Sequence, residues 1–275
     1  MMDPNFIGIG AQKSGTSWIY QMLRQHPEVY VPSKVKELHF FNKQINYNKG
    51  INWYRSLFEE YENQRAIGEF TPNYFWTSDD IREIKESGRT RNPPYLVHKH
   101  YPEMKFILSL RNPITRAISA YYHHIGARRI SPFTRIIDVG KKFGIITMGF
   151  YDIHLKNWFK YFSPDQFLII IYEENIVKNF YQTIETLYQF IGVNTHFKPQ
   201  NMKVRYNMGR SHFYLRMHYY SPKIAEILMR KLPPILLNSK VWKIPIYERE
   251  IDYLEKIYSQ NNKNLSTLIS QKLPW

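Results

Sequence analysis

Residues 6–17, FIGIGAQKSGTS, join a short apolar run to a turn that is punctuated by glycine. The apolar run predicts a strand, and the WIYQMLRQ that follows predicts a helix. Gly10 and Gly15 permit backbone angles and close approaches that a β-carbon would obstruct. Backbone N–H groups of such a turn point inward, and the helix dipole adds partial positive charge. Because Lys13 supplies a full charge, the stretch predicts an anion-binding turn, although an ordinary turn between a strand and a helix would look similar.

The nucleotide P-loop, G-x-x-x-x-G-K-[ST], has the same spacing between its glycines as Gly10 and Gly15. Here the second glycine is followed by Thr16 and Ser17, so the lysine of that motif is missing. The lysine of this turn lies inside it, at Lys13. Such a turn can hold a phosphate, but it is poorly built to reach a γ-phosphate together with Mg²⁺.

The composition limits the classes of protein to which the chain can belong. Its 275 residues are enough for one large α/β domain, and we expect a single domain over residues 1–275. The absence of cysteine excludes disulfides, thiol catalysis and thiolate metal sites. The net charge of +15 favours an anionic partner, yet the chain has no dense basic run of the kind found in nucleic-acid-binding tails.

The strongest apolar runs, such as FILSL and FLIIIY, have the length of strands, so we expect no membrane-spanning segment. Near the N-terminus, no basic region is followed by an apolar one, so we expect no signal peptide or membrane anchor. These features, together with the missing cysteines, predict a soluble and cytoplasmic protein.

Strand-like and helix-like segments alternate along the chain, as in an α/β fold. Besides the first strand, strands are expected at residues 65–70, 105–110 and 167–172. Besides the first helix, helices are expected at residues 52–63, 78–87, 114–124, 151–162 and 183–191. Residues 88–94 and 201–211 are expected to be loops, and residues 213–275 to be mostly helical, with a last helix over residues 247–270.

The strand at residues 105–110 ends in Arg111, Asn112 and Pro113, and the last two are typical of a helix start. A P-loop NTPase would usually end the comparable strand in an acid that holds Mg²⁺. Arg111 predicts instead a second anion site, with Ser119 two helical turns further on donating a hydroxyl. The alternative is an ion pair of Arg111 at the edge of the sheet.

Glu37 and His39 lie two residues apart in a segment that prolines should keep extended or looped. In an extended segment, both side chains point to one face, where a carboxylate and an imidazole could form a general base. Taken alone, the segment fits a surface glutamate and a histidine packed beside Phe40 and Phe41 better.

Taken together, these segments resemble the sulfotransferases that use 3′-phosphoadenosine-5′-phosphosulfate (PAPS), in particular the heparan sulfate branch. In that family, a K-x-G-T-[ST] turn binds the 5′-phosphosulfate, and residues 13–17 read KSGTS. A second motif, L-R-[DN]-P-x-x-R-x-x-S-x-Y, binds the 3′-phosphate, and residues 110–121 read LRNPITRAISAY. The two motifs in this order are far more specific than either alone, and they account for the missing nucleotide lysine and the missing acid.

The same branch carries the pattern H-P-x-V followed by K-E-x-H-F-F, which residues 26–29 and 36–41 match. The resemblance implies that Glu37 is the catalytic base and that His39 acts beside it. This implication overturns the preference for a surface glutamate that the segment alone supports.

Two positions depart from the pattern of the family. Phe70 replaces a lysine that contacts the substrate or the transferring group in relatives, within an otherwise matching E-K-[TS]-P-x-Y-F pattern at residues 69–75. Gly209 and Arg210 resemble an S-K-G-R loop that covers the cofactor, but Met208 replaces its lysine. Both departures leave the acceptor and part of the charge stabilisation open.

The resemblance implies a P-loop-like three-layer α/β fold with a central, mostly parallel sheet. It implies transfer of a sulfuryl group from PAPS to a hydroxyl or amine, most simply of a carbohydrate that could itself be anionic, with no metal required. The catalytic residues would be Glu37, Lys13 and His39. The cofactor would be bound by Lys13, Ser14, Gly15, Thr16, Ser17, Trp18, Arg111, Ser119, Gly209 and Arg210. A P-loop kinase or NTPase, and a non-catalytic polyanion-binding module, are the alternatives.

Overall fold

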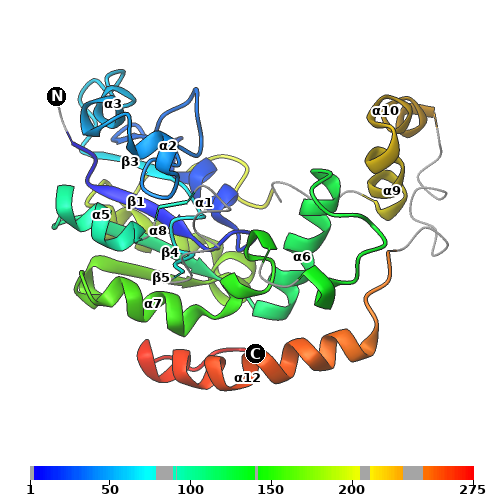
Figure 1. Cartoon of the computed structure of the whole chain (residues 1–275). Helices are drawn as coiled ribbons and strands as arrows, with labels where there is room; N and C mark the ends of the chain where they lie inside the picture. Colours follow the sequence, from blue (N-terminus) through cyan, green and yellow to red (C-terminus); the bar gives the residue numbers. More distant parts are fainter. Residues whose placement is uncertain (1–2, 79–88, 91, 140–141, 205–210, 232–243) are drawn as a thin grey trace.

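The computed structural model describes residues 3–78, 89–90, 92–139, 142–204, 211–231 and 244–275 of the chain (Figure 1). Its centre is a five-stranded sheet in the order β2-β3-β1-β4-β5, in which all neighbouring strands are parallel. The strands are β1 (Phe6–Gly10), β2 (Val29–Tyr30), β3 (Ala66–Phe70), β4 (Lys105–Leu110) and β5 (Phe167–Ile171). All carboxyl ends therefore meet at one edge, where sheets of this kind bind their ligands.

Helices surround the sheet, and their bounds in the described part of the chain are as follows. They are α1 (Thr16–Leu23), α2 (Gln44–Tyr47), α3 (Ile51–Ser56), α5 (Pro93–His100), α6 (Pro113–Gly126), α7 (Tyr151–Phe159), α8 (Phe180–Ile191), α9 (His212–Tyr220), α10 (Pro222–Lys231) and α12 (Glu248–Leu268). A π-helical segment, η5 (Tyr172–Lys178), follows β5.

The sheet has a helical layer on each face, which confirms the predicted α/β fold. Phe6 and Ile107 point into one core with α1 and α8. Phe106 and Leu108 point into the other core with α3, α5 and α7, since side chains alternate along a strand. Helix α12 runs along the outside of α7 (Figure 1).

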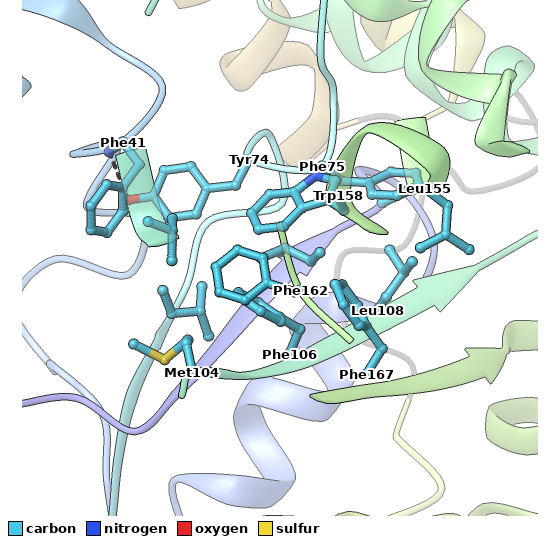
Figure 2. Close-up of a cluster of buried hydrophobic side chains, with 14 of the residues drawn as sticks. Phe41, Tyr74, Phe75, Met104, Phe106, Leu108, Leu155, Trp158, Phe162 and Phe167 are labelled. Carbon is cyan, nitrogen blue, oxygen red and sulfur yellow. Dashed lines mark hydrogen bonds between the residues drawn. The ribbon is translucent and has the colours of Figure 1, made fainter. Parts of the chain in front are cut away.

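The core under α7 is built from aromatic rings (Figure 2). The ring of Phe106 on β4 lies 5.0 Å from that of Trp158, 4.6 Å from that of Phe162 and 4.8 Å from that of Phe167. Trp158 is fully buried. Burying a large aromatic side chain contributes about 1.5–3 kcal/mol, so this cluster fixes α7 on the sheet.

Proline marks the start of two helices. Helix α6 begins at Pro113, and the side-chain oxygen of Asn112 accepts hydrogen bonds from two backbone N–H groups of its first turn, as predicted. The prediction of a loop at residues 88–94 is wrong at its C-terminal end, because Pro93 and Pro94 are the first residues of α5. Proline suits the first turn of a helix, and the side chain of Asn92 caps this one.

Other expectations hold with different bounds. The helix expected over residues 52–63 ends at Ser56 in α3, and α8 begins at Phe180, before the expected start. The last helix, expected over residues 247–270, is confirmed as α12. Most of the helix expected at residues 78–87 lies outside the described residues. No helix in the described ranges is both long and apolar enough to cross a bilayer.

A buried carboxylate holds the end of β3 against α3. Glu69 is fully buried and accepts hydrogen bonds from the hydroxyls of Tyr54 (3.0 Å), Tyr74 (2.8 Å) and Thr71 (2.6 Å). The three donors offset part of the free-energy cost of burying this carboxylate. Burial is the larger effect, so the pKa of Glu69 is raised. The network fixes the turn that follows β3 at the carboxyl edge of the sheet.

His154 on α7 connects the segment after β3, at Thr77, with the segment before α7, at Thr147. Its Nε2 donates to the backbone oxygen of Thr147 (2.9 Å), while its Nδ1 lies 3.0 Å from the hydroxyl of Thr77 and accepts from the Thr77 N–H. Burial lowers the pKa of His154 to about 4. The imidazole is therefore neutral in the folded protein at neutral pH.

The neutral state of His154 predicts a loss of stability in acid. Below pH 6.5 the unfolded chain binds a proton at this residue that the folded chain takes up only near pH 4, so the free energy of unfolding falls between these values. His154 accounts for roughly 3 kcal/mol of that fall. When the free energy of unfolding is measured by urea unfolding between pH 4 and 7, it should change less with pH in His154→Gln than in the wild type. His196→Gln, at an exposed turn, should keep the wild-type slope, and an unchanged slope in His154→Gln would contradict the assignment.

Candidate functional site

A cavity of about 930 Å³ opens at the carboxyl edge of the sheet. Its walls come from residues that directly follow four strands: Lys13 after β1, Asn73 after β3, Arg111 after β4 and Tyr172 after β5. The segment of Glu37 and the N-terminus of α1 complete it. The cavity is therefore built where a parallel sheet places its ligands.

The turn between β1 and α1 has the geometry of an anion cradle. Gly15 precedes the first residue of α1 with φ 86°, and Lys13 has φ 70°. A β-carbon on Gly15 would come within 2.8 Å of Ile176 and Tyr172, so only glycine fits there. The first turn of α1 contains no acidic residue. The N–H groups at this helix start and the helix dipole therefore favour an anion, as the sequence predicts.

Arg111 lies beside this turn. Its Nη1 donates to the backbone oxygen of Lys13 (3.3 Å), its Nε donates to the hydroxyl of Thr115 (2.9 Å), and the guanidinium lies 5.2 Å from the ring of Tyr172. Ser119 lines the same cavity from α6. The structure thus brings Lys13, Arg111 and Ser119 together. Within the described residues, Arg111 contacts a hydroxyl, a carbonyl and a ring. It does not form there the ion pair that the sequence left open as the alternative.

Glu37 and His39 also meet in the cavity. The Nε2 atom of His39 lies 3.3 Å from a carboxylate oxygen of Glu37, and its Nδ1 lies 3.2 Å from the side-chain oxygen of Asn42. Of the two forms that the sequence allows, extended or looped, the segment adopts a loop here, since His39 has φ 52° and the backbone turns there. The pairing predicted from the sequence is therefore present, but its geometry differs.

Hydrogen bonds from the Glu69 network hold this segment in place. The N–H of Phe40 donates to the hydroxyl of Tyr74 (2.9 Å), and the N–H of His39 donates to the hydroxyl of Thr71 (3.3 Å). Both hydroxyls donate in turn to Glu69. The position of Glu37 next to the cradle thus depends on a carboxylate buried behind it.

The charges around the cavity shift the pKa values of the two central groups. Burial lowers the pKa of Lys13, and repulsion by Arg111 and Lys36 adds to this effect. Burial acts to raise the pKa of Glu37, but the hydrogen bond from His39 and the charges of His39, Lys36 and His123 outweigh it and leave the pKa lowered. Glu37 is therefore ionised at neutral pH, as a general base must be.

The outer wall of the cavity combines aromatic and basic side chains. The guanidinium of Arg89 lies 3.7 Å from the ring centre of Trp76, and the rings of His124 and Phe143 stack at 4.8 Å. Phe143 has φ 56°, in the left-handed region. Burial, followed by the charges of His123 and other neighbours, lowers the pKa of His124 to about 3, so this ring is neutral.

A buried arginine supports that wall. Arg116 is fully buried and donates to the backbone oxygens of Gly144 and Ile145, directly after Phe143. Gly144 packs so closely on Trp76 that a β-carbon would lie 3.1 Å from its ring. Arg116 belongs to the arginine motif of residues 110–121, but it stabilises the wall from behind and does not line the cavity.

The remaining predicted residues have the following places. Thr16, Ser17 and Trp18 line the cavity, and the indole N–H of Trp18 donates to the backbone oxygen of Met202 (2.8 Å). Ser14 is buried, and its backbone oxygen accepts a hydrogen bond from the hydroxyl of Ser109 (2.5 Å), which ties the turn to β4.

Gly209 and Arg210 lie outside the described residues, so the closing loop stays a prediction.

Several lining residues escaped the sequence analysis. They include Lys36, Asn42, Asn73, Arg89, His123, His124, Arg129 and Phe143. Two of them carried a signal in the chain: Lys36 directly precedes Glu37, and His123 follows Ser119 by one helical turn, on the same face of α6. The others come from segments whose approach depends on the tertiary fold.

The chemistry of the lining fits a ligand that carries an anion at each end. Two groups of residues line the cavity: Lys13 with the N-terminus of α1, here called the first cradle, and Arg111 with Ser119, called the second cradle. Trp18 and Met202 lie next to the first cradle and provide apolar surface. A bisphosphorylated nucleoside meets these requirements, because its ribose carries two separate charged groups and an aromatic base.

Comparisons with known proteins agree with this geometry. The profile of the sulfotransferase domain family matches residues 3–221. The mouse heparan sulfate glucosamine 3-O-sulfotransferase 6 is 26% identical over 280 residues, which cover 99% of this chain and 73% of the mouse protein. The human heparan sulfate glucosamine 3-O-sulfotransferase 5 is 32% identical over 180 residues, which cover 61% of this chain and 47% of the human protein.

Among solved structures, a sulfotransferase from Alicyclobacillus acidocaldarius superposes with a TM-score of 0.69. The two chains are 22% identical, and the match covers 99% of this chain and 98% of the bacterial one. At this identity the likeness concerns the fold. Together with the profile match over most of the sequence, it shows that the chain belongs to the sulfotransferase domain family.

Proposed function

We propose that the protein transfers a sulfuryl group from PAPS to a hydroxyl of a carbohydrate. The observation that carries this proposal is the arrangement of two anion cradles in one cavity with the ionised Glu37 beside the first. PAPS has a phosphate at its 3′ position and a phosphosulfate at its 5′ position, so its charges match the cradles. The match to heparan sulfate glucosamine 3-O-sulfotransferases supports a carbohydrate hydroxyl as the acceptor.

Each residue of the site has a role in this mechanism. The N–H groups at the start of α1 and the ammonium of Lys13 bind the 5′ end, where negative charge develops during transfer. Arg111 and Ser119 bind the 3′-phosphate through charge-assisted hydrogen bonds. Glu37 accepts the proton of the acceptor hydroxyl, and His39 orients its carboxylate. Bound PAPS supplies the sulfuryl group itself.

The basic side chains of the outer wall support an acceptor that carries negative charge. Lys43 and Arg129 are exposed and line the cavity beyond Glu37, and Arg89 lines it from the side of Trp76. A sulfated or carboxylated sugar would be attracted to this opening. A separate feature speaks against the kinase alternative: β4 is followed by Arg111, where an NTPase has an acid.

Replacing the proposed base tests the chemical step. Glu37→Gln should bind adenosine 3′,5′-bisphosphate (PAP), the product, with unchanged affinity, because Glu37 contacts the acceptor and not the nucleotide. Its turnover with radiolabelled PAPS should fall by about 10²–10⁴-fold, the usual contribution of a positioned base. Glu60→Gln, at the surface, serves as the control and should match the wild type. Wild-type turnover in Glu37→Gln would remove Glu37 from this role.

Replacing Arg111 tests the second cradle. Arg111→Ala should weaken PAP binding by at least about tenfold, as expected when one charged hydrogen-bonding partner is lost, while adenosine 5′-monophosphate binding stays nearly unchanged. Isothermal titration calorimetry measures both affinities. Arg135→Ala, in an exposed ion pair with Asp138, is the matched control. Equal losses for both nucleotides would refute a 3′-phosphate site at Arg111.

A further inference from the structure

Lys36 reaches from the segment of Glu37 to the anion-binding turn. Its ammonium donates to the hydroxyl of Ser17 in the first turn of α1 (2.7 Å) and lies 5.5 Å from the ring centre of Tyr20. The side chain is half-buried and lines the cavity. Lys36 therefore joins the two parts of the site that the mechanism treats separately, the cradle and the base.

The cations of the cradle repel one another. Lys36 and Arg111 both contribute to the lowered pKa of Lys13, after burial. Burial also lowers the pKa of Lys36, although the carboxylate of Glu37 acts in the opposite direction. Three positive groups around one helix N-terminus repel one another, and a ligand of more than one negative charge between them would offset that repulsion. A phosphosulfate is such a ligand.

The position where relatives have a lysine cannot supply a charge here. Phe70 is fully buried, and its ring packs between those of Phe6 (6.2 Å) and Tyr20 (5.9 Å). A β-carbon on Gly8 would come within 2.0 Å of the Phe70 ring, so glycine at that position makes room for it. The ammonium of Lys36 lies 5.5 Å from the centre of the Tyr20 ring, and the guanidinium of Arg24 lies 5.8 Å from it.

We propose that Lys36 is a catalytic residue whose ammonium contacts the oxygens of the 5′-phosphosulfate and replaces the charge that the phenylalanine at position 70 does not provide. This inference rests on the proposed function. In the transfer, the bond between sulfur and the bridging oxygen of the 5′-phosphate breaks, and its electron pair stays on that oxygen. A bond forms between sulfur and the acceptor oxygen, whose proton goes to Glu37. Because Lys36 directly precedes Glu37 and donates to Ser17 at the start of α1, its ammonium would face the oxygen that gains charge.

Binding measurements test where Lys36 acts. Lys36→Met should weaken PAP binding by about tenfold, the equivalent of one charge-assisted hydrogen bond, and should leave the binding of adenosine 3′-monophosphate, which has no 5′ group, unchanged. Lys34→Met is the matched control: Lys34 is exposed, pairs with Glu60 and should not affect either nucleotide. Titration calorimetry measures all affinities, and thermal melting of the unliganded variants checks that they fold.

The rate gives a second readout. With water as the acceptor, conversion of PAPS to PAP by Lys36→Met should be slower by about 10²-fold, the cost of removing one charge-stabilising group. Because Lys36 helps to keep the pKa of Glu37 low, its loss should also move the acidic limb of the pH–rate profile to higher pH. Lys36→Arg, which keeps the charge, should retain the position of that limb.

Three results would overturn the inference. One is wild-type PAP affinity and rate in Lys36→Met. Another is an equal loss of affinity for PAP and adenosine 3′-monophosphate, which would assign Lys36 a general effect on the cavity. The third is a wild-type protein that does not bind PAP, and this result alone would also remove the proposed function.

Discussion

The structure depends on concentrated positive charge at the carboxyl edge of a parallel sheet. The N-terminus of α1, Lys13 and Arg111 converge there, and burial, followed by repulsion from Arg111 and Lys36, lowers the pKa of Lys13. Such an arrangement costs free energy in the empty protein and is stabilised when an anion binds. The positive groups do not themselves hold the backbone of the segment that contains Glu37. Buried hydrogen bonds behind the cavity do so.

The supporting interactions lie behind the cavity and are mostly buried. Glu69 fixes Tyr74 and Thr71, which in turn hold the backbone of the segment that contains Glu37. On the opposite side, Arg116 holds the backbone next to Phe143. Rigid support of this kind keeps catalytic groups at the distances that group transfer requires. The site thus combines positive groups that repel one another with surrounding backbone that is held by buried hydrogen bonds.

Local sequence signals predicted both anion sites, because strand, turn and helix start lie within one short stretch around Lys13 and again around Arg111, but they left an ordinary turn and an ion pair open as alternatives. The spacing of Glu37 and His39 allowed their pairing, but only the resemblance to the sulfotransferases favoured it over a surface glutamate. The left-handed backbone at His39, whose N–H donates to the distant Thr71, left no signal in the sequence. Pro93 and Pro94, the first residues of α5, were predicted to lie in a loop, because proline is found both where helices end and where they begin. Long-range packing, such as that between Gly144 and Trp76, left no signal in the chain.

The most direct test of the two-cradle account compares PAP with adenosine 5′-diphosphate, which carries the same two phosphates in one chain. Titration calorimetry of the wild-type protein without Mg²⁺ should show PAP binding at least about tenfold more tightly, because only PAP places one phosphate in each cradle. Addition of Mg²⁺ should leave this order unchanged. Equal affinities, or tighter and Mg²⁺-dependent binding of the diphosphate, would contradict the account.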